Sequence, residues 1–205
     1  MAFKISISET TPEWDTLAVA NLTYFPFEKG DYKPFTHGRL YGKDKAVHVQ
    51  LICFEVAVVA EQLTPGMEML KDSCVTFQIN PCPQKSRTYL SVTCNEKGTA
   101  YALVCEENGQ APFSEKGLKE PAVRVLHGDN NMGIFWGVEY ALSAETLQRI
   151  YGDIPFASGH ILEGNILKSR FSDEKPHFGS FFPYEEETPG LFSRRSFGEF
   201  VLVRY

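Results

Sequence analysis

The chain has 205 residues, of which 43% are hydrophobic and 13% are aromatic, and its formal net charge is −6. Clustered Lys and Arg residues, which displace counterions from nucleic-acid phosphates, are missing, so we expect no nucleic-acid partner. No apolar run approaches the roughly 18 residues of a membrane span, and the first nine residues lack the apolar segment of a signal peptide. We therefore expect a cytoplasmic protein without a membrane partner.

The five cysteines argue for a reducing compartment as well. Their number is odd, no C-x-x-C pair occurs, and most of them lie in apolar strand-like segments. This pattern predicts buried reduced thiols and disfavours a structural zinc site. The residues are Cys53, Cys74, Cys82, Cys94 and Cys105.

Short segments of alternating polarity, separated by turn residues, dominate the first part of the chain. We expect a turn or short helical entry at 11–14, an extended segment at 17–22 and a surface loop at 25–35. The predicted strands are 3–7 and the hairpin of 36–41 with 46–54.

The segment 69–81 gives the clearest strand signal. Val75, Phe77 and Ile79 alternate with Thr76 and Gln78, and turn-forming residues bound the run on both sides. This period of two predicts a half-buried strand with the two polar side chains on an exposed face.

The second half continues as a β-rich chain with a single helix. Ser143 is a good N-cap for a helix at 143–151, which is too short to be stable alone, and residues 106–121 read as an exposed loop. The predicted strands are 88–94, 99–105, 122–127, 133–141, 160–170 and 197–204, and the segment 175–183 follows a turn.

About ten short strands and one minor helix indicate an all-β fold. We expect an antiparallel β-sandwich, of the jelly-roll or immunoglobulin-like kind, with one short helix. Since no repeat, linker or low-complexity segment interrupts the sequence, residues 1–205 are predicted to form one domain.

Several motifs in a fixed order resemble the family-9-like carbohydrate-binding modules, which are related to modules attached to bacterial xylanases. The resemblance covers about residues 35–205 and implies a sandwich that binds a sugar between two Trp rings without cleaving it. It also implies that no cofactor is required, with calcium as a possible ligand. The motifs are Asp72-Ser73-Cys74-Val75, Tyr89–Asn95 with Gly98, Phe135–Leu142, Gly164–Lys168, Pro176–Ser180 and Phe197-Gly198.

The resemblance also implies a set of sugar-binding residues. Met69 stands where the family has its first sandwiching Trp, Leu191 or Phe192 stands near the second, and Thr76 replaces a Glu. From the residues alone, Asp72 could equally cap a turn, and Asn165 could satisfy backbone groups. The predicted binding residues are Met69, Asp72, Thr76, Asn165, Lys168, His177 and Phe192.

Three functions are consistent with the sequence. The first is non-catalytic binding of a mono- or oligosaccharide in carbohydrate catabolism. The second is glycoside hydrolysis by a pair of carboxylates, for which Asp72, Glu139, Glu163 and Asp173 are candidates without a distinguishing spacing. The third is an interaction domain with an unidentified protein partner on a degenerate sugar-binding scaffold. A cluster of aromatic residues could form the surface that binds this partner, although core packing explains the cluster equally well. Its members are Phe178, Phe181, Phe182 and Phe192.

Overall fold

The computed structural model describes residues 2–28 and 31–204. Residues 29–30 of the predicted loop 25–35 and the two end residues of the predicted domain lie outside this part of the chain. Within it, no helix is long and apolar enough to cross a membrane.

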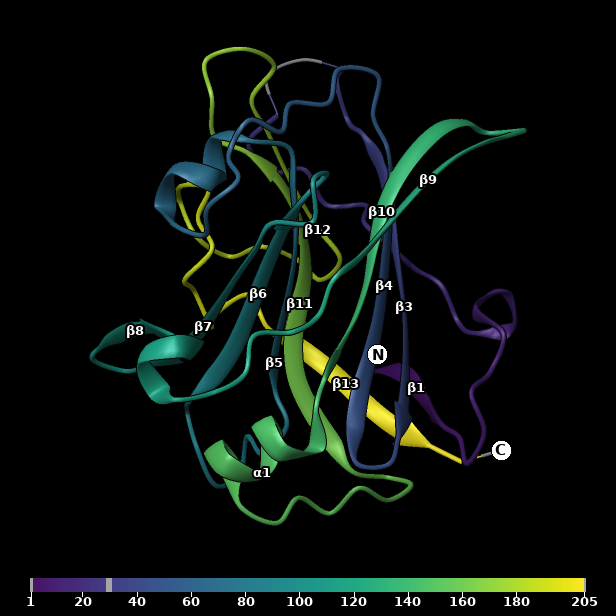
Figure 1. Ribbon diagram of the computed structural model, residues 1–205, viewed down its shortest axis with the longest axis vertical. Helices are drawn as coiled ribbons and strands as arrows, with labels where there is room; N and C mark the ends of the chain where they lie inside the picture. The colour runs from purple at the N-terminus through teal and green to yellow at the C-terminus, as the bar shows by residue number, and fades with distance from the viewer. Residues whose placement is uncertain (1, 29–30, 205) are drawn as a thin grey trace.

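The described residues form mostly strands, with one α-helix and three short 3-10 helices (Figure 1). The helices are η1 (Trp14–Thr16), η2 (Met67–Lys71), η3 (Phe113–Lys116) and α1 (Ala144–Tyr151). The strands are β1 (Phe3–Ile7), β2 (Ala20–Asn21), β3 (Phe35–Lys43), β4 (Ala46–Phe54), β5 (Cys74–Asn80), β6 (Tyr89–Asn95), β7 (Ala100–Glu106), β8 (Gly109–Pro112), β9 (Arg124–Asn130), β10 (Gly133–Leu142), β11 (Ile161–Arg170), β12 (His177–Ser180) and β13 (Gly198–Val203).

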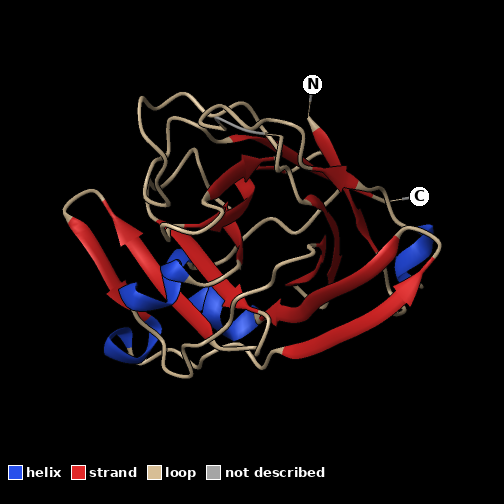
Figure 2. Ribbon diagram, turned by 90° about the horizontal axis from the view of Figure 1, so that it is seen from above, coloured by secondary structure: helices blue, strands red, loops and turns tan. Residues whose placement is uncertain are grey.

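All of these strands belong to one curled sheet that folds into two layers. The order is β8-β7-β6-β5-β11-β13-β1-β3-β4-β10-β9, with β12 added to β11 and β2 added to β3. Figure 1 shows strands β5 to β8 and β11 on one side and β3, β4, β10 and β9 on the other, and Figure 2 shows from above how the sheet curls. The predicted all-β sandwich with one α-helix is therefore confirmed.

The first strand corrects one part of the prediction, because it makes the sheet mixed. β1 runs parallel to both of its neighbours, with Lys4 opposite Val201 of β13 and Ser6 opposite Tyr41 of β3. The remaining strand pairs are antiparallel. Alternation within a strand cannot reveal this direction, because the two partners of β1 lie at opposite ends of the chain.

The hydrophobic core fills the space between the two layers. Val75, Phe77 and Ile79 of β5 are fully buried there, together with Leu51 of β4 and Val138 of β10. Burial of such side chains contributes about 1.5–3 kcal/mol each. The core face predicted for β5 is therefore confirmed.

The other face of β5 is not exposed, which corrects the expectation of a half-buried strand. Thr76 and Gln78 are 0% and 2% exposed. The Thr76 hydroxyl lies 2.9 Å from the Thr93 hydroxyl of β6, and the Gln78 amide donates to the carbonyl of Leu191. A C-terminal segment thus covers this face of the strand.

Outside the core, the sequence predicted some local elements correctly and missed others. The Ser143 hydroxyl accepts a hydrogen bond of 3.1 Å from the Thr146 N–H, as expected of an N-cap. The predicted loop 106–121 instead contains β8 and η3, and the extended segment 17–22 contributes only the two-residue β2. Alternation is too short in β8 and β2 to mark them as strands.

The cysteines and the C-terminal aromatic residues behave as structural groups. All five cysteines are buried and unpaired. Phe178 is 2% exposed, Phe181 and Phe182 pack against the core, and Phe192 is 37% exposed. Core packing therefore explains the first three aromatic residues and leaves Phe192 for another role.

Candidate functional site

The outer face of the β5–β8 layer carries a transverse row of side chains. Tyr89 of β6 pairs with Cys105 of β7, and Cys105 pairs with Gln110 of β8. Since paired residues of neighbouring strands point to the same face, these three side chains lie side by side. Tyr89 and Cys105 cluster with Leu103 outside the main core.

A cavity of about 550 Å³ lies over this row. Its aromatic groups are Tyr89, Phe192 and Phe197, with the rings of Tyr89 and Phe197 5.0 Å apart and nearly perpendicular. The complete lining consists of Arg87, Tyr89, Cys105, Glu106, Glu107, Gly109, Gln110, Glu163, Phe192, Arg194, Arg195 and Phe197.

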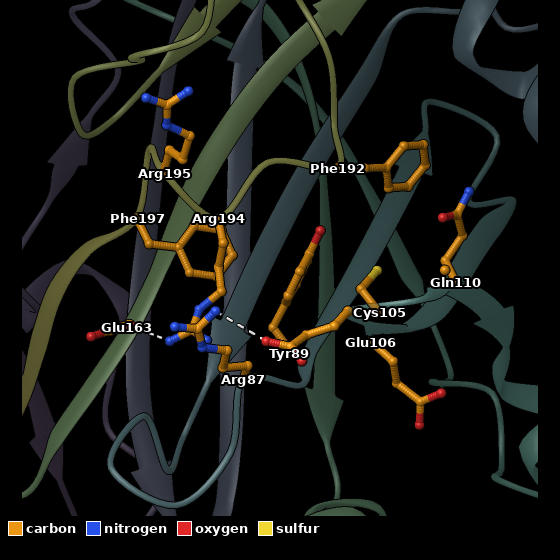
Figure 3. A pocket seen from close by; sticks show the side chains of 12 residues that line it. Arg87, Tyr89, Cys105, Glu106, Gln110, Glu163, Phe192, Arg194, Arg195 and Phe197 are labelled. Carbon is orange, nitrogen blue, oxygen red and sulfur yellow. Dashed lines mark hydrogen bonds and ion pairs between the residues drawn. The ribbon is translucent and has the colours of Figure 1, made fainter.

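Charged side chains of both signs surround the aromatic groups. Arg87 and Glu107 lie 3.0 Å apart, and Arg194 and Glu163 lie 2.6 Å apart. In Figure 3, the Arg87 and Arg194 side chains lie on one side of Tyr89, and Phe192 and Gln110 lie on the other. The wall therefore offers hydrogen-bond donors and acceptors next to ring faces.

The polar groups in the floor of the cavity remain neutral. Burial raises the pKa of the Tyr89 hydroxyl well above its ordinary value and that of the Cys105 thiol to about 11. A thiol with a raised pKa is a poor nucleophile, because the thiolate is the reactive form. Cys105 is thus suited to packing rather than to covalent chemistry.

The wall contributed by residues 191–197 is fixed from beneath. Leu191 is 2% exposed and packs with Leu70, Leu167 and Phe178. Asn165 of β11 donates a 2.7 Å hydrogen bond to the Ser196 carbonyl and is fully buried. Asn165 therefore supports the cavity wall instead of lining the cavity.

Three predicted binding residues at the start of β5 are also buried. Met69 and Thr76 have no exposed surface, and Asp72 is 1% exposed. The Asp72 carboxylate accepts hydrogen bonds from the backbone N–H groups of Glu61 and Gln62, at 3.1 and 3.0 Å, and from the Asn95 amide at 2.9 Å. Asp72 thereby ties the segment before β5 to the end of β6.

Lys168 and His177 lie between the layers. Lys168 pairs with Val75, a core residue, so its side chain enters the core side of the sheet. Its ammonium lies 3.1 Å from the Glu55 carboxylate and 2.7 Å from Nε2 of His177. All three side chains are fully buried.

The protonation states of this buried cluster follow from its contacts. Burial and the positive charge of Lys168 lower the pKa of His177 to about 4, so its Nε2 accepts from the ammonium and its Nδ1 donates to the Lys175 carbonyl. Burial alone would raise the pKa of Glu55, but Lys168 and hydrogen bonds such as that from Ser73 lower it overall. The Glu55 carboxylate also accepts from the Trp136 indole at 3.2 Å.

The structure thus does not bring the seven predicted residues together at one accessible site. Of these residues, Phe192 borders the cavity, and the other six are buried. Whether any of them contacts a sugar stays a prediction.

Other cavity residues were not among the predicted binding residues. Tyr89 could have been placed on the outer face by alternation with Leu90 and Val92, and Phe197 and Glu163 had been noted in other roles. Nothing in the sequence relates Arg87 to Arg194, because the fold brings them together from the turn before β6 and from the C-terminal segment.

Metal ligands are not grouped in the part of the chain that the structure describes. There, no cluster of three or more His, Cys, Asp or Glu side chains could hold a metal ion. The calcium prediction gains no support from this side-chain arrangement, and independence from cofactors stays a prediction.

The sequence matches the model of carbohydrate-binding family 9 over residues 10–202. The chain therefore belongs to carbohydrate-binding family 9, as the resemblance had predicted. No curated protein sequence matches it.

Solved structures share the fold at low sequence identity. A Bacteroides uniformis protein, for which carbohydrate binding has been suggested, has a TM-score of 0.78, 17% identity, and coverage of 98% of each chain. A family 9 module from Caldicellulosiruptor kristjanssonii in complex with cellotriose has a TM-score of 0.62, 12% identity, and coverage of 98% of this chain and 94% of that chain. A family 9 module from the same organism in complex with glucose has a TM-score of 0.61 and 13% identity, and the match covers 98% of this chain and 96% of that chain.

Proposed function

We propose that the protein binds a mono- or oligosaccharide, without cleaving it, in the cavity over Tyr89, Cys105 and Gln110. The observation that carries the proposal is the half-exposed Phe192 ring at a cavity whose walls provide both donors and acceptors. The C–H face of a sugar packs on such a ring, and its hydroxyl groups need polar partners of both kinds. Two of the solved neighbours are family 9 modules in complex with cellotriose and with glucose.

The charge pattern supports a neutral sugar. Three carboxylates border the cavity, and each has a cation beside it: Lys116 for Glu106, Arg87 for Glu107, and Arg194 for Glu163. Such pairs can donate to one hydroxyl and accept from the next without attracting a net charge.

The same pairs favour binding over hydrolysis. A glycosidase needs one carboxyl group that holds a proton until it reaches the leaving oxygen. The three carboxylates at the cavity are each engaged by a neighbouring cation, which suits them to hydrogen bonding with sugar hydroxyls. We therefore propose a non-catalytic role in carbohydrate catabolism within the cytoplasm.

Calorimetric titration tests the proposal. Glucose and cellotriose serve as first probes, followed by a panel of other neutral and acidic sugars. Phe192→Ala should weaken binding about fivefold or more, as expected for loss of an aromatic contact. Leu63→Ala, which changes an apolar residue that is 73% exposed and does not line the cavity, should leave affinity unchanged.

Two outcomes would contradict the proposal. One is the absence of saturable heat with every sugar of the panel. The other is turnover of aryl glycosides that disappears in Glu163→Gln, since this would make the cavity a catalytic site.

A further inference from the structure

The outer face of the other layer carries an aromatic row of its own, formed by Phe35, Phe54 and Phe135. Phe35 of β3 is paired with Phe54 of β4, and their ring centroids lie 5.7 Å apart. The ring of Phe135 on β10 lies 5.6 Å from that of Phe54. The row thus crosses three neighbouring strands at nearly even steps.

Solvent reaches this aromatic row. Phe35 is 39% exposed, and the other two rings are half-buried. A Cβ atom on Gly128 of β9 would come within 2.5 Å of the Phe135 ring, so the glycine allows the ring to lie over the neighbouring strand. Phe135 therefore covers the sheet surface instead of pointing straight into solvent.

An unsatisfied histidine nitrogen adjoins the aromatic row. The His37 ring is 9% exposed and lies 5.7 Å from the Phe35 ring and 6.4 Å from the Phe54 ring. Its Nε2 is 3.3 Å from the Arg39 guanidinium, whereas Nδ1 has no hydrogen-bond partner in the described part of the chain. Buried polar groups are normally satisfied, so this nitrogen would gain a hydrogen bond if the His37 ring turned toward a ligand on this face.

A row of planar polar groups runs beside the histidine. Gln50 of β4 donates a 2.8 Å hydrogen bond to Glu139 of β10, and Arg124 of β9 lies 3.3 Å from the same carboxylate. Arg39 of β3 lies 3.5 Å from the Gln50 amide oxygen. The face therefore combines rings with adjacent donors and acceptors.

We propose that this face is a second carbohydrate site, which binds a neutral oligosaccharide along the Phe35–Phe54–Phe135 row. The rings would pack on successive sugar faces, while His37 and the polar row would bind hydroxyl groups. Neighbouring rings are inclined to each other by 42° and 50°, so the row is not flat. Such a platform fits a single soluble sugar chain better than a flat polymer surface.

The second site is independent of the cavity. It lies on β3, β4 and β10, whereas the residues that line the cavity include Tyr89 of β6, Cys105 of β7 and Gln110 of β8. Figure 1 shows these two sets of strands in different layers. The proposal consequently does not rest on the function proposed for the cavity, and either site can exist without the other.

Amide NMR spectra during titration with cellotriose and cellohexaose separate the two sites. We expect shifts near Gly128 and Phe135 that persist in Phe192→Ala. In Phe54→Ala the apparent Kd obtained from these shifts should rise about fivefold or more. Ile134→Ala, which removes a neighbouring apolar side chain that is 74% exposed, should have no effect.

Phe54→Leu and Phe35→Ala serve as further variants in case Phe54→Ala does not fold. Phe54→Leu keeps an apolar side chain in place, and Phe35→Ala changes the most exposed ring of the row. The proposal is overturned if neither sugar shifts this face of the wild-type protein, or if the shifts survive all three Phe substitutions. Concentration-dependent shifts at the same residues without sugar would also overturn it, since they would mark a contact between copies of the chain.

Discussion

The ammonium of Lys168 lies 3.1 Å from the carboxylate of Glu55, and neither side chain is exposed to solvent. Glu55 follows β4, while Lys168 lies on β11, so the pair connects the two layers of the sandwich. A residue that the family pattern predicts to bind sugar thus takes part in an internal ion pair.

Removing the lysine charge should destabilise the protein strongly. Lys168→Met leaves Glu55 buried without its cation, which typically costs about 3–5 kcal/mol. The free energy of unfolding in urea measures this loss. In the double variant Lys168→Met, Glu55→Gln much of the stability should return. A loss of less than about 1 kcal/mol in the single variant would contradict the ion-pair interpretation.

Stability should fall as the pH is lowered from about 6.5 toward 4. The pKa of His177 is lowered from 6.5 to about 4 in the folded protein, so the unfolded chain binds the proton first across this interval. Urea unfolding at a series of pH values measures how the free energy of unfolding changes with pH. In His177→Gln this slope should decrease by about 1.4 kcal/mol per pH unit. His37, whose pKa is also lowered to about 4, should retain its own contribution in that variant. An unchanged slope would show that His177 is not held neutral.

Asp72 should matter for stability rather than affinity. Asp72→Ala removes the acceptor of three N–H donors, and unsatisfied buried groups cost about 1–3 kcal/mol. Thermal unfolding, with Asp153→Ala at an exposed ion pair as the control, measures this loss. If Asp72 contacts sugar, as the family pattern implies, Asp72→Asn would instead weaken binding while the protein stays folded.

Glu163 should matter for sugar affinity rather than for stability. Glu163→Gln breaks an ion pair that is partly exposed, so the free energy of unfolding should change by less than about 1 kcal/mol. Loss of a charged hydrogen-bond acceptor at the cavity should weaken sugar binding about tenfold. Calorimetry on Glu163→Gln and on the matched Asp153→Asn variant measures the difference. Equal affinity in both would exclude Glu163 from the binding site.

Local patterns predicted the elements better than their assembly. The alternation of Val75, Phe77 and Ile79 gave the core face of β5 correctly, because that face is decided within the strand. The burial of Gln78 could not be predicted, because Leu191, which lies 113 positions later, covers it. Parallel pairing of β1 with β13 escaped prediction for the same reason.

The cavity was predictable only in part. Phe192 was identified through its place before the Phe197-Gly198 motif, and it does border the cavity. Asp72, Lys168 and His177 match the family pattern, yet their side chains satisfy buried groups within the fold. Sequence pattern alone does not distinguish a polar residue that faces a ligand from one that faces the interior.

The central claim is that sugar binds over Tyr89, and amide NMR during a cellotriose titration tests it most directly. We predict saturable shifts centred on Tyr89, Cys105, Arg194 and Phe197, with about fivefold or greater weakening in Phe192→Ala. Saturable binding that leaves these residues unshifted, or unaltered affinity in Phe192→Ala, would contradict the claim.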